Sequence, residues 1–127
     1  MPQQKKPAKV NFGNKFLKGY FAFDDFILSN DHEASPLILD DMMIGLVTEE
    51  TAFSSEYDGI IGLAYSSLAE PDVIPFFDKL MSDGLLKQNA FSFFLSAHND
   101  ESSELMLGGW DEKRHNKEIV WHPVINK

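Results

Sequence analysis

Two neighbouring segments, one a glycine-punctuated apolar run and the other a helical pattern, constrain most strongly what this chain can fold into. Residues 60–63 read Ile-Ile-Gly-Leu, a short continuous apolar run that is typical of a strand buried on both faces of a sheet. Shortly after it, apolar side chains recur at the spacing of an amphipathic helix over residues 73–81, with Asp72 as a plausible N-cap, Pro75 in the first turn and Gly84 as the stop. A central strand and a core-packing helix are therefore predicted.

The remaining apolar segments are rich in residue types that favour strands. Residues 10–28 predict strands joined by a hairpin centred near Gly13-Asn14-Lys15, and residues 29–36 predict a loop. Residues 37–47 predict a second strand region, broken by Asp40-Asp41 and by Gly45, with loop-like sequence over residues 48–56.

The C-terminal third predicts a second hairpin. Residues 91–97 read as a strand, residues 98–103 as a polar turn and residues 104–107 as its partner strand, after which Gly108-Gly109 breaks the pattern. A final strand is expected over residues 118–122. The fold class is mostly β with one or two short helices.

The composition limits the classes of function that the chain can have. The chain has 127 residues with 43% hydrophobic residues and eleven Phe, which indicates a packed core rather than a disordered tail. A formal net charge of −9 argues against nucleic-acid binding, because phosphate recognition needs clustered Lys and Arg. The chain has no Cys, no apolar run of about 20 residues and no signal-peptide pattern over residues 1–10. No membrane segment is expected, and compartment is not readable from these features.

Common catalytic and metal-binding patterns are absent from the sequence. Asp24-Asp25 and Asp40-Asp41 are adjacent carboxylates, but neighbours on a strand point to opposite faces and cannot share a proton, so solvated turn charges are the better interpretation. The four His have neither the i, i+4 spacing nor the Cys companions of a metal site, and no Ser lies in a nucleophile-elbow pattern. No Gly-rich phosphate loop is present. Neither metal nor cofactor is therefore predicted.

The order of these motifs carries a family resemblance. Tyr57-Asp58-Gly59-Ile60-Ile61-Gly62-Leu63-Ala64-Tyr65, then Pro75-Phe76-Phe77-Asp78-Lys79-Leu80, then Glu104-Leu105-Met106-Leu107-Gly108-Gly109 together resemble the middle of a pepsin-like aspartic endopeptidase of the cathepsin D kind. The resemblance implies a portion of one lobe, running into the junction with the next, over residues 10–127, after a polar and flexible start at residues 1–9. That family cleaves peptides with two Asp-Thr/Ser-Gly loops, and neither motif occurs in this chain.

The resemblance also places a substrate-binding site. Residues Phe12-Gly13-Asn14-Lys15 correspond to the family's flap, a Tyr-Gly-Thr/Ser-Gly hairpin that closes over bound peptide. Phe12 has no hydroxyl to join the hydrogen bonds over the catalytic water, and Lys15 stands where a Gly is usual. Tyr57 and Ile60 correspond to residues that line the pocket before the cleaved bond, and Phe53 is a candidate third member. The alternative is that Tyr57 and Ile60 are ordinary core residues.

Two functions remain open. We favour a truncated piece of a pepsin-like endopeptidase, predicted inactive alone, with no catalytic residue of its own and a peptide or protein as the substrate of the intact enzyme. The alternative is a non-catalytic binding or assembly subunit that keeps the middle of the fold. Incomplete sheets predict either association, with a complementing chain or with itself, or a molten monomer. The resemblance suggests a secreted, lysosomal or vacuolar protein.

Overall fold

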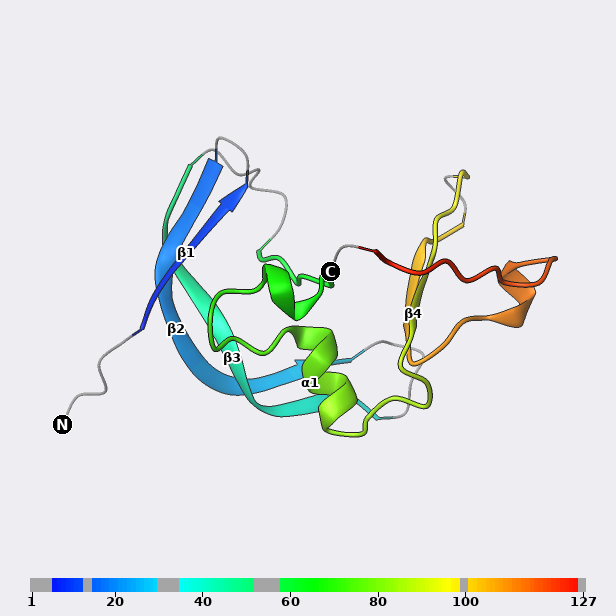
Figure 1. The fold of residues 1–127 in the computed structure, drawn as a ribbon, viewed down its shortest axis with the longest axis horizontal. Helices are drawn as coiled ribbons and strands as arrows, with labels where there is room; N and C mark the ends of the chain where they lie inside the picture. The colour runs from blue at the N-terminus through cyan, green and yellow to red at the C-terminus, as the bar shows by residue number, and fades with distance from the viewer. Residues whose placement is uncertain (1–5, 13–14, 30–34, 52–57, 99–100, 126–127) are drawn as a thin grey trace. The chain divides into compact units, whose positions relative to one another are not determined.

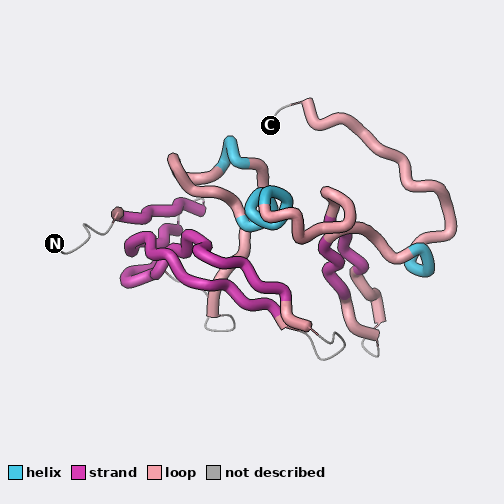
Figure 2. The backbone as a smooth tube through the Cα atoms, turned by 90° about the horizontal axis from the view of Figure 1, so that it is seen from below, coloured by secondary structure: helices cyan, strands magenta, loops and turns pink. Residues whose placement is uncertain are grey.

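The fold is described from a computed structural model that covers residues 6–12, 15–29, 35–51, 58–98 and 101–125. The predicted class is confirmed: the described residues form two antiparallel sheets, one α-helix and two short 3-10 helices, η1 (Ser66–Leu68) and η2 (Glu112–Arg114). Figure 1 labels the main elements, and Figure 2 shows the strands in magenta. The chain divides into two compact units, residues 1–79 and residues 80–127, which are described separately below.

The first unit is built on a three-stranded sheet with the order β1 (Pro7–Phe12), β2 (Lys15–Leu28), β3 (Leu37–Glu50). β1 and β2 pair antiparallel from Pro7↔Tyr20 to Phe12↔Lys15, so only two residues separate the strands at the hairpin end. The predicted hairpin is therefore confirmed in its position, although β1 begins three residues earlier than the expected strand. In Figure 1 β2 and β3 are long, curved strands that run side by side.

The prediction that Asp40-Asp41 interrupts the second strand was wrong. β3 runs unbroken from Leu37 to Glu50 and so also includes the start of the segment that had been predicted as a loop. The pairs Asp24↔Met42 and Phe26↔Leu39 place Asp40 and Asp41 opposite the single residue Asp25, which is a β-bulge. Asp41 adopts a positive φ of 54°, a conformation that Asp tolerates better than most residues. The acidic pair therefore bends the strand without ending it.

Helix α1 (Phe76–Ser82) begins later than the sequence pattern indicated. The N–H of Lys79 donates to the carbonyl of Pro75 over 2.9 Å, so Pro75 takes the N-cap position that had been assigned to Asp72. Asp72 lies in the preceding turn with a φ of 65°. The predicted stop is confirmed, because Gly84 has a φ of 67° and the N–H groups of Gly84 and Leu85 close a Schellman motif onto Met81 and Leu80.

The buried apolar residues described in the first unit are Leu39 and Met42 of β3 and Phe76 of α1. Leu80 of α1, the first residue of the second unit, is completely inaccessible. Phe76 packs edge-to-face on Phe26 of β2, with 5.7 Å between the ring centroids. The apolar stripe of α1 is therefore core packing, as predicted.

The second unit contains the predicted hairpin of β4 (Phe91–Phe94) and β5 (Glu104–Leu107). The strands pair antiparallel from Phe91↔Leu107 to Phe94↔Glu104, and β4 ends three residues earlier than expected. Gly108 and Gly109 end β5 with positive φ angles of 85° and 153°. Both of their N–H groups donate to the carbonyl of Ala90, which anchors the turn at the start of β4.

Two predicted strands do not form. Residues 60–63 and residues 118–122 have no regular structure, and Ile60 is 54% exposed and Trp121 70% exposed. A strand buried on both faces needs a hydrogen-bonded neighbour along each edge. The described part of the chain forms only the two sheets above, and neither provides an edge that pairs with these segments.

Candidate substrate-binding site

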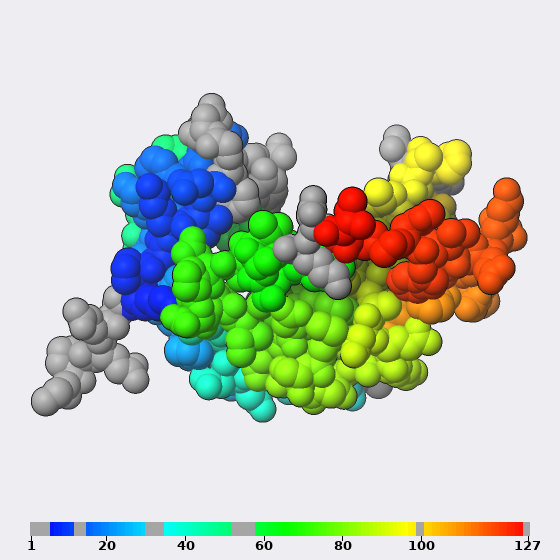
Figure 3. All heavy atoms as spheres, in the orientation of Figure 1, coloured from blue at the N-terminus to red at the C-terminus, as the bar shows by residue number. Residues whose placement is uncertain are grey.

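The predicted flap residues lie at the turn of the β1–β2 hairpin. Phe12 is the last residue of β1 and is paired with Lys15, the first residue of β2. Gly13, Asn14 and the side chain of Phe12 lie outside the described residues. The backbone thus places Phe12 beside the turn of the hairpin. In Figure 3 the atoms of β1, in dark blue, form part of the visible surface of the first unit.

Close to its turn, the hairpin is held to β3 by Thr51, the residue that follows that strand. The N–H of Thr51 donates to the carbonyl of Phe16 over 3.1 Å, and the N–H of Phe16 donates to the hydroxyl oxygen of Thr51 over 2.8 Å. Two residues further along β2, the ammonium of Lys18 lies 3.2 Å from the carboxylate of Glu49 and 4.5 Å from the ring centroid of Phe16. Backbone and side-chain contacts therefore join the hairpin to β3 near its turn.

Gly19 lets the two long strands approach each other closely. A bulge lies beside it, because Lys18 pairs with Glu49 and Gly19 with Val47, which leaves Thr48 as an extra residue on β3. A Cβ atom placed on Gly19 would lie 1.8 Å from the carbonyl oxygen of Leu46, far inside van der Waals contact. The local geometry of β2 and β3 at this point therefore requires glycine.

Of the three predicted pocket residues, Ile60 alone is among the described residues; Phe53 and Tyr57 lie outside them. Ile60 lies in an irregular segment with 54% of its surface exposed. An exposed apolar side chain in this position is accessible to a ligand. The structure does not bring Phe12 and Ile60 into a described common cavity.

The two acidic pairs meet across the bulge between β2 and β3. Asp24 accepts the N–H of Asp25 over 2.9 Å, and Asp25 accepts the N–H of Asp41 over 3.2 Å. These carboxylates are exposed, and two of them hold the backbone of the bulge. Sequence reasoning treated the pairs separately and did not predict that they lie opposite each other. Among the described residues no group of three or more His, Cys, Asp or Glu could hold a metal ion.

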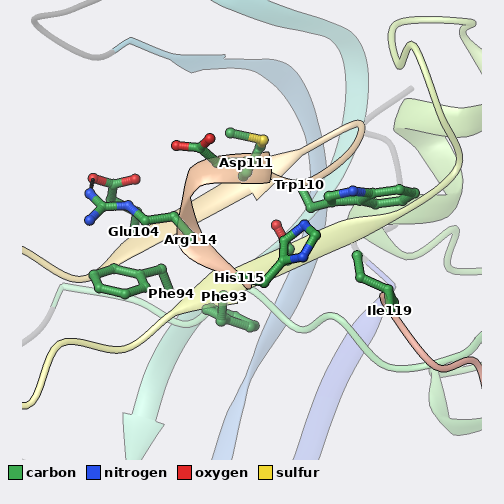
Figure 4. Close-up of a pocket in the computed structure, with 10 residues that line it drawn as sticks. Phe93, Phe94, Glu104, Trp110, Asp111, Arg114, His115 and Ile119 are labelled. Carbon is green, nitrogen blue, oxygen red and sulfur yellow. Dashed lines mark hydrogen bonds and ion pairs between the residues drawn. The ribbon is translucent and has the colours of Figure 1, made fainter. Parts of the chain in front are cut away.

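A shallow depression of about 160 Å³ lies in the second unit, next to the β4–β5 hairpin (Figure 4). Arg114 of η2 forms ion pairs with Glu101 and Glu104, and its guanidinium carbon lies 4.1 Å from the ring centroid of Phe94. The hydrogen bonds that Arg114 donates to the carboxylates of Glu101 and Glu104 raise the pKa of Arg114 above its ordinary value, so this residue stays charged. Because its guanidinium already binds two carboxylates, Arg114 organises the hairpin rather than receiving a ligand.

His115 lies beside this cluster. Its Nδ1 is 2.8 Å from the carbonyl oxygen of Lys117, which fits an Nδ1–H that donates to that carbonyl. Its Nε2 lies 3.2 Å from a carboxylate oxygen of Glu112, within ion-pair distance, but the geometry is not that of a hydrogen bond and the atom is buried. Trp110 donates to the other oxygen of Glu112 over 3.0 Å and packs on Trp121. Sequence reasoning did not predict this cluster, because its contacts join residues that are far apart in the chain, such as Arg114 with Glu101 and with Phe94.

Among the described residues no helix is both long and apolar enough to cross a membrane. The model of the eukaryotic aspartyl protease family matches residues 1–127. Over 122 residues the chain is 35% identical to pepsin A-5 of Mus musculus, which covers 94% of this chain and 30% of that protein. It is 33% identical over 119 residues to pregnancy-associated glycoprotein 2 of Bos taurus, which covers 93% of this chain and 30% of that protein.

Chymosin of Camelus dromedarius gives a similar result, 33% identity over 122 residues, with 94% of this chain and 30% of that protein covered. The chain therefore spans about 30% of the length of the curated relatives that it matches. The motif order read from the sequence, the mostly β structure and these comparisons agree. The chain belongs to the eukaryotic aspartyl protease family.

Proposed function

We propose that this chain is the flap-bearing segment of a pepsin-like aspartic endopeptidase and that it acts only when flanking sequence supplies the two catalytic Asp. In such an enzyme two carboxylates share a proton, one activating water and the other protonating the carbonyl of the scissile bond. The chain contributes peptide binding: the hairpin covers the substrate and an apolar wall receives one side chain. The substrate class is a peptide or protein.

The observation that carries this proposal is the register of the first hairpin. β1 and β2 remain paired up to Phe12↔Lys15, which puts the residues that correspond to the family's flap at the two-residue end of a hairpin. Residues 13–14 join the strands there. We assign Phe12, Gly13 and Asn14 to the cover over the peptide, and Phe53, Tyr57 and Ile60 to the wall. The exposure of Ile60 supports its assignment.

The direct test is to express the segment together with its coding flanks and to measure casein cleavage at acidic pH, with and without pepstatin. The proposal expects cleavage that pepstatin abolishes and that a Gly13→Pro variant reduces, because proline fixes φ and removes a backbone donor at the hairpin end. An active enzyme that is insensitive both to pepstatin and to Gly13→Pro would contradict the assignment of the flap.

A second candidate is a non-catalytic binding or assembly subunit. It is favoured by two substitutions in the flap, Phe12 for the family's Tyr and Lys15 for its Gly. The first removes a hydroxyl and the second removes conformational freedom, and neither prevents an apolar cover over a peptide. A protein that binds pepstatin but cleaves no substrate would support this candidate over the first.

Restoring Tyr at position 12 gives a quantitative prediction. In the full-length enzyme, Phe12→Tyr should raise kcat severalfold and leave KM nearly unchanged, because the added hydroxyl stabilises charge that develops in the transition state. Steady-state kinetics on one peptide substrate measure both constants. A changed KM with an unchanged kcat would instead indicate that position 12 contributes uniform binding.

The isolated chain should also associate. Phe23 on β2, Phe93 on β4 and Leu95 just after β4 are each more than half exposed, at 60%, 58% and 76%, whereas Phe21 is only partly exposed. Large exposed apolar residues on sheets with open edges favour assembly or a dye-binding, loosely packed state. Sedimentation velocity measures the assembly, and ANS fluorescence detects the loosely packed state. A monodisperse monomer with a sharp thermal transition and no ANS binding would show that the chain is a self-sufficient domain.

A further inference from the structure

One side-chain contact beside the proposed flap replaces a backbone contact. Beyond the bulge beside Gly19, β2 and β3 pair through Lys18↔Glu49 and Leu17↔Glu50, and continuing this register puts Phe16 opposite Thr51. In a regular antiparallel pair of this type each residue donates its N–H to the carbonyl of the other. Thr51 donates to Phe16 in that way over 3.1 Å, but the N–H of Phe16 donates to the Thr51 hydroxyl oxygen over 2.8 Å. The hydroxyl oxygen thus stands in for the Thr51 carbonyl.

The use of the hydroxyl oxygen in place of the carbonyl oxygen as acceptor has two consequences for the backbone. The N–H of Phe16 keeps an acceptor, so the ladder extends one residue further toward the hairpin end than the strand β3 itself. At the same time the carbonyl oxygen of Thr51 is not the recorded acceptor of the Phe16 N–H. Phe16 is also paired with Asn11 of β1, so a contact at Phe16 acts on both strands of the hairpin.

The neighbouring contacts are weaker anchors. The ion pair of Lys18 with Glu49 joins side chains that are 43% and 58% exposed, and pairs of this kind contribute little in salt. The Thr51 hydroxyl is part-buried and binds backbone, which cannot rotate away as a long side chain can. Thr51 is therefore the contact on which the last pairing step of β2 with β3 depends.

We propose that Thr51 is a positioning residue for peptide binding: its hydroxyl holds the hairpin at Phe16, close to the turn that joins β1 and β2. The inference rests on the function proposed above, because it assigns the hairpin to the cover over the substrate. If the hairpin is held in place, a larger fraction of molecules is competent to bind peptide, and the apparent dissociation constant falls in proportion.

The first test measures the contact itself by amide hydrogen exchange, in Thr51→Val and Thr51→Ser variants. Val keeps the shape and β-branching of Thr without the hydroxyl, whereas Ser keeps the hydroxyl. Exchange at the Phe16 amide should be about fivefold to tenfold faster in Thr51→Val and close to wild type in Thr51→Ser. The amide of Phe21, which donates to the carbonyl of Lys6, is the internal control and should not change.

The second test separates positioning from simple destabilisation in the full-length enzyme. Thr51→Val should raise KM for a peptide substrate roughly threefold to tenfold with kcat unchanged, and Thr51→Ser should restore KM. A merely structural role would lower the active fraction, so that the maximal rate falls with KM unchanged. Equal exchange at Phe16 in the two variants, or an unchanged KM in an active enzyme, would overturn the inference.

The two proposals fail in distinguishable ways. If the wild-type full-length protein shows no pepstatin-sensitive cleavage, the proposed function fails, and the role of Thr51 in substrate binding fails with it, whatever the exchange rates show. If the wild type is active and Thr51→Val has the wild-type KM, only the role of Thr51 fails.

Discussion

The 127-residue chain alone is expected to show no pepstatin-sensitive cleavage of casein or haemoglobin. Both Asp-Thr/Ser-Gly motifs are absent, and loss of the catalytic groups of a protease lowers kcat by on the order of 10⁶, leaving only binding and positioning. The assay should cover about pH 3 to pH 7, which extends from pH values at which a carboxylate pair shares one proton to values at which both carboxylates are ionised. Release of acid-soluble peptide is the measurement.

A control for the cleavage assay comes from the β-bulge at which Asp40 and Asp41 lie opposite Asp25. Asp25 and Asp41 lie opposite each other there, and Asp25 accepts the N–H of Asp41 over 3.2 Å. If the chain did cleave substrate, Asp25→Asn would test whether this carboxylate takes part in the reaction. Cleavage that pepstatin blocks and Asp25→Asn removes would contradict the requirement for flanking catalytic residues.

The largest structural effect is expected for Gly19→Ala. The added Cβ would lie 1.8 Å from the carbonyl oxygen of Leu46 and 2.8 Å from its carbonyl carbon, and both are backbone atoms that cannot rotate away. Relief requires β2 and β3 to separate where the hairpin joins the sheet. We expect a loss of about 3 kcal/mol or more in the free energy of unfolding, or failure of the two strands to pair.

Gly45→Ala is the matched control for this prediction. Gly45 lies on β3, and a Cβ there would meet only a ring carbon of Phe21 at 3.8 Å, which is ordinary contact. Because alanine loses less backbone entropy than glycine on folding, this variant should be neutral or more stable by about 0.5 kcal/mol. Urea denaturation followed by circular dichroism compares the two variants. Equal stability of the two variants would show that β2 and β3 are not as close at Gly19 as the structure has them.

The features that the sequence predicted correctly are local ones. The first hairpin followed from strand-forming residues on both sides of Gly13-Asn14, and the helix stop followed from Gly84. The start of α1 was misplaced by about three residues, because Pro75 supplies the first carbonyl acceptor and the apolar spacing extends upstream of it. A pattern of side chains shows which face is apolar, but it does not fix which residue caps the helix.

The errors come from contacts that are distant in sequence or outside the described sheets. Residues 60–63 have the composition of a buried strand, but a strand forms only where a neighbour pairs with it. Asp40-Asp41 was expected to break a strand, whereas Asp25 across the ladder supplies an acceptor that makes it a bulge. Likewise Thr51 showed no signal, because its partner Phe16 is 35 residues away. Of the candidate site, sequence reasoning located the hairpin but not the contact that holds it.

The coding sequence on both sides of this segment tests the central claim most directly. The account predicts an in-frame Asp-Thr-Gly or Asp-Ser-Gly motif upstream of the flap and a second one downstream of residue 127, read from the full transcript. These two motifs would supply one carboxylate each to the dyad that this chain lacks. In-frame stop codons on both sides of the segment, with neither motif between them, would contradict the account and favour a non-catalytic subunit.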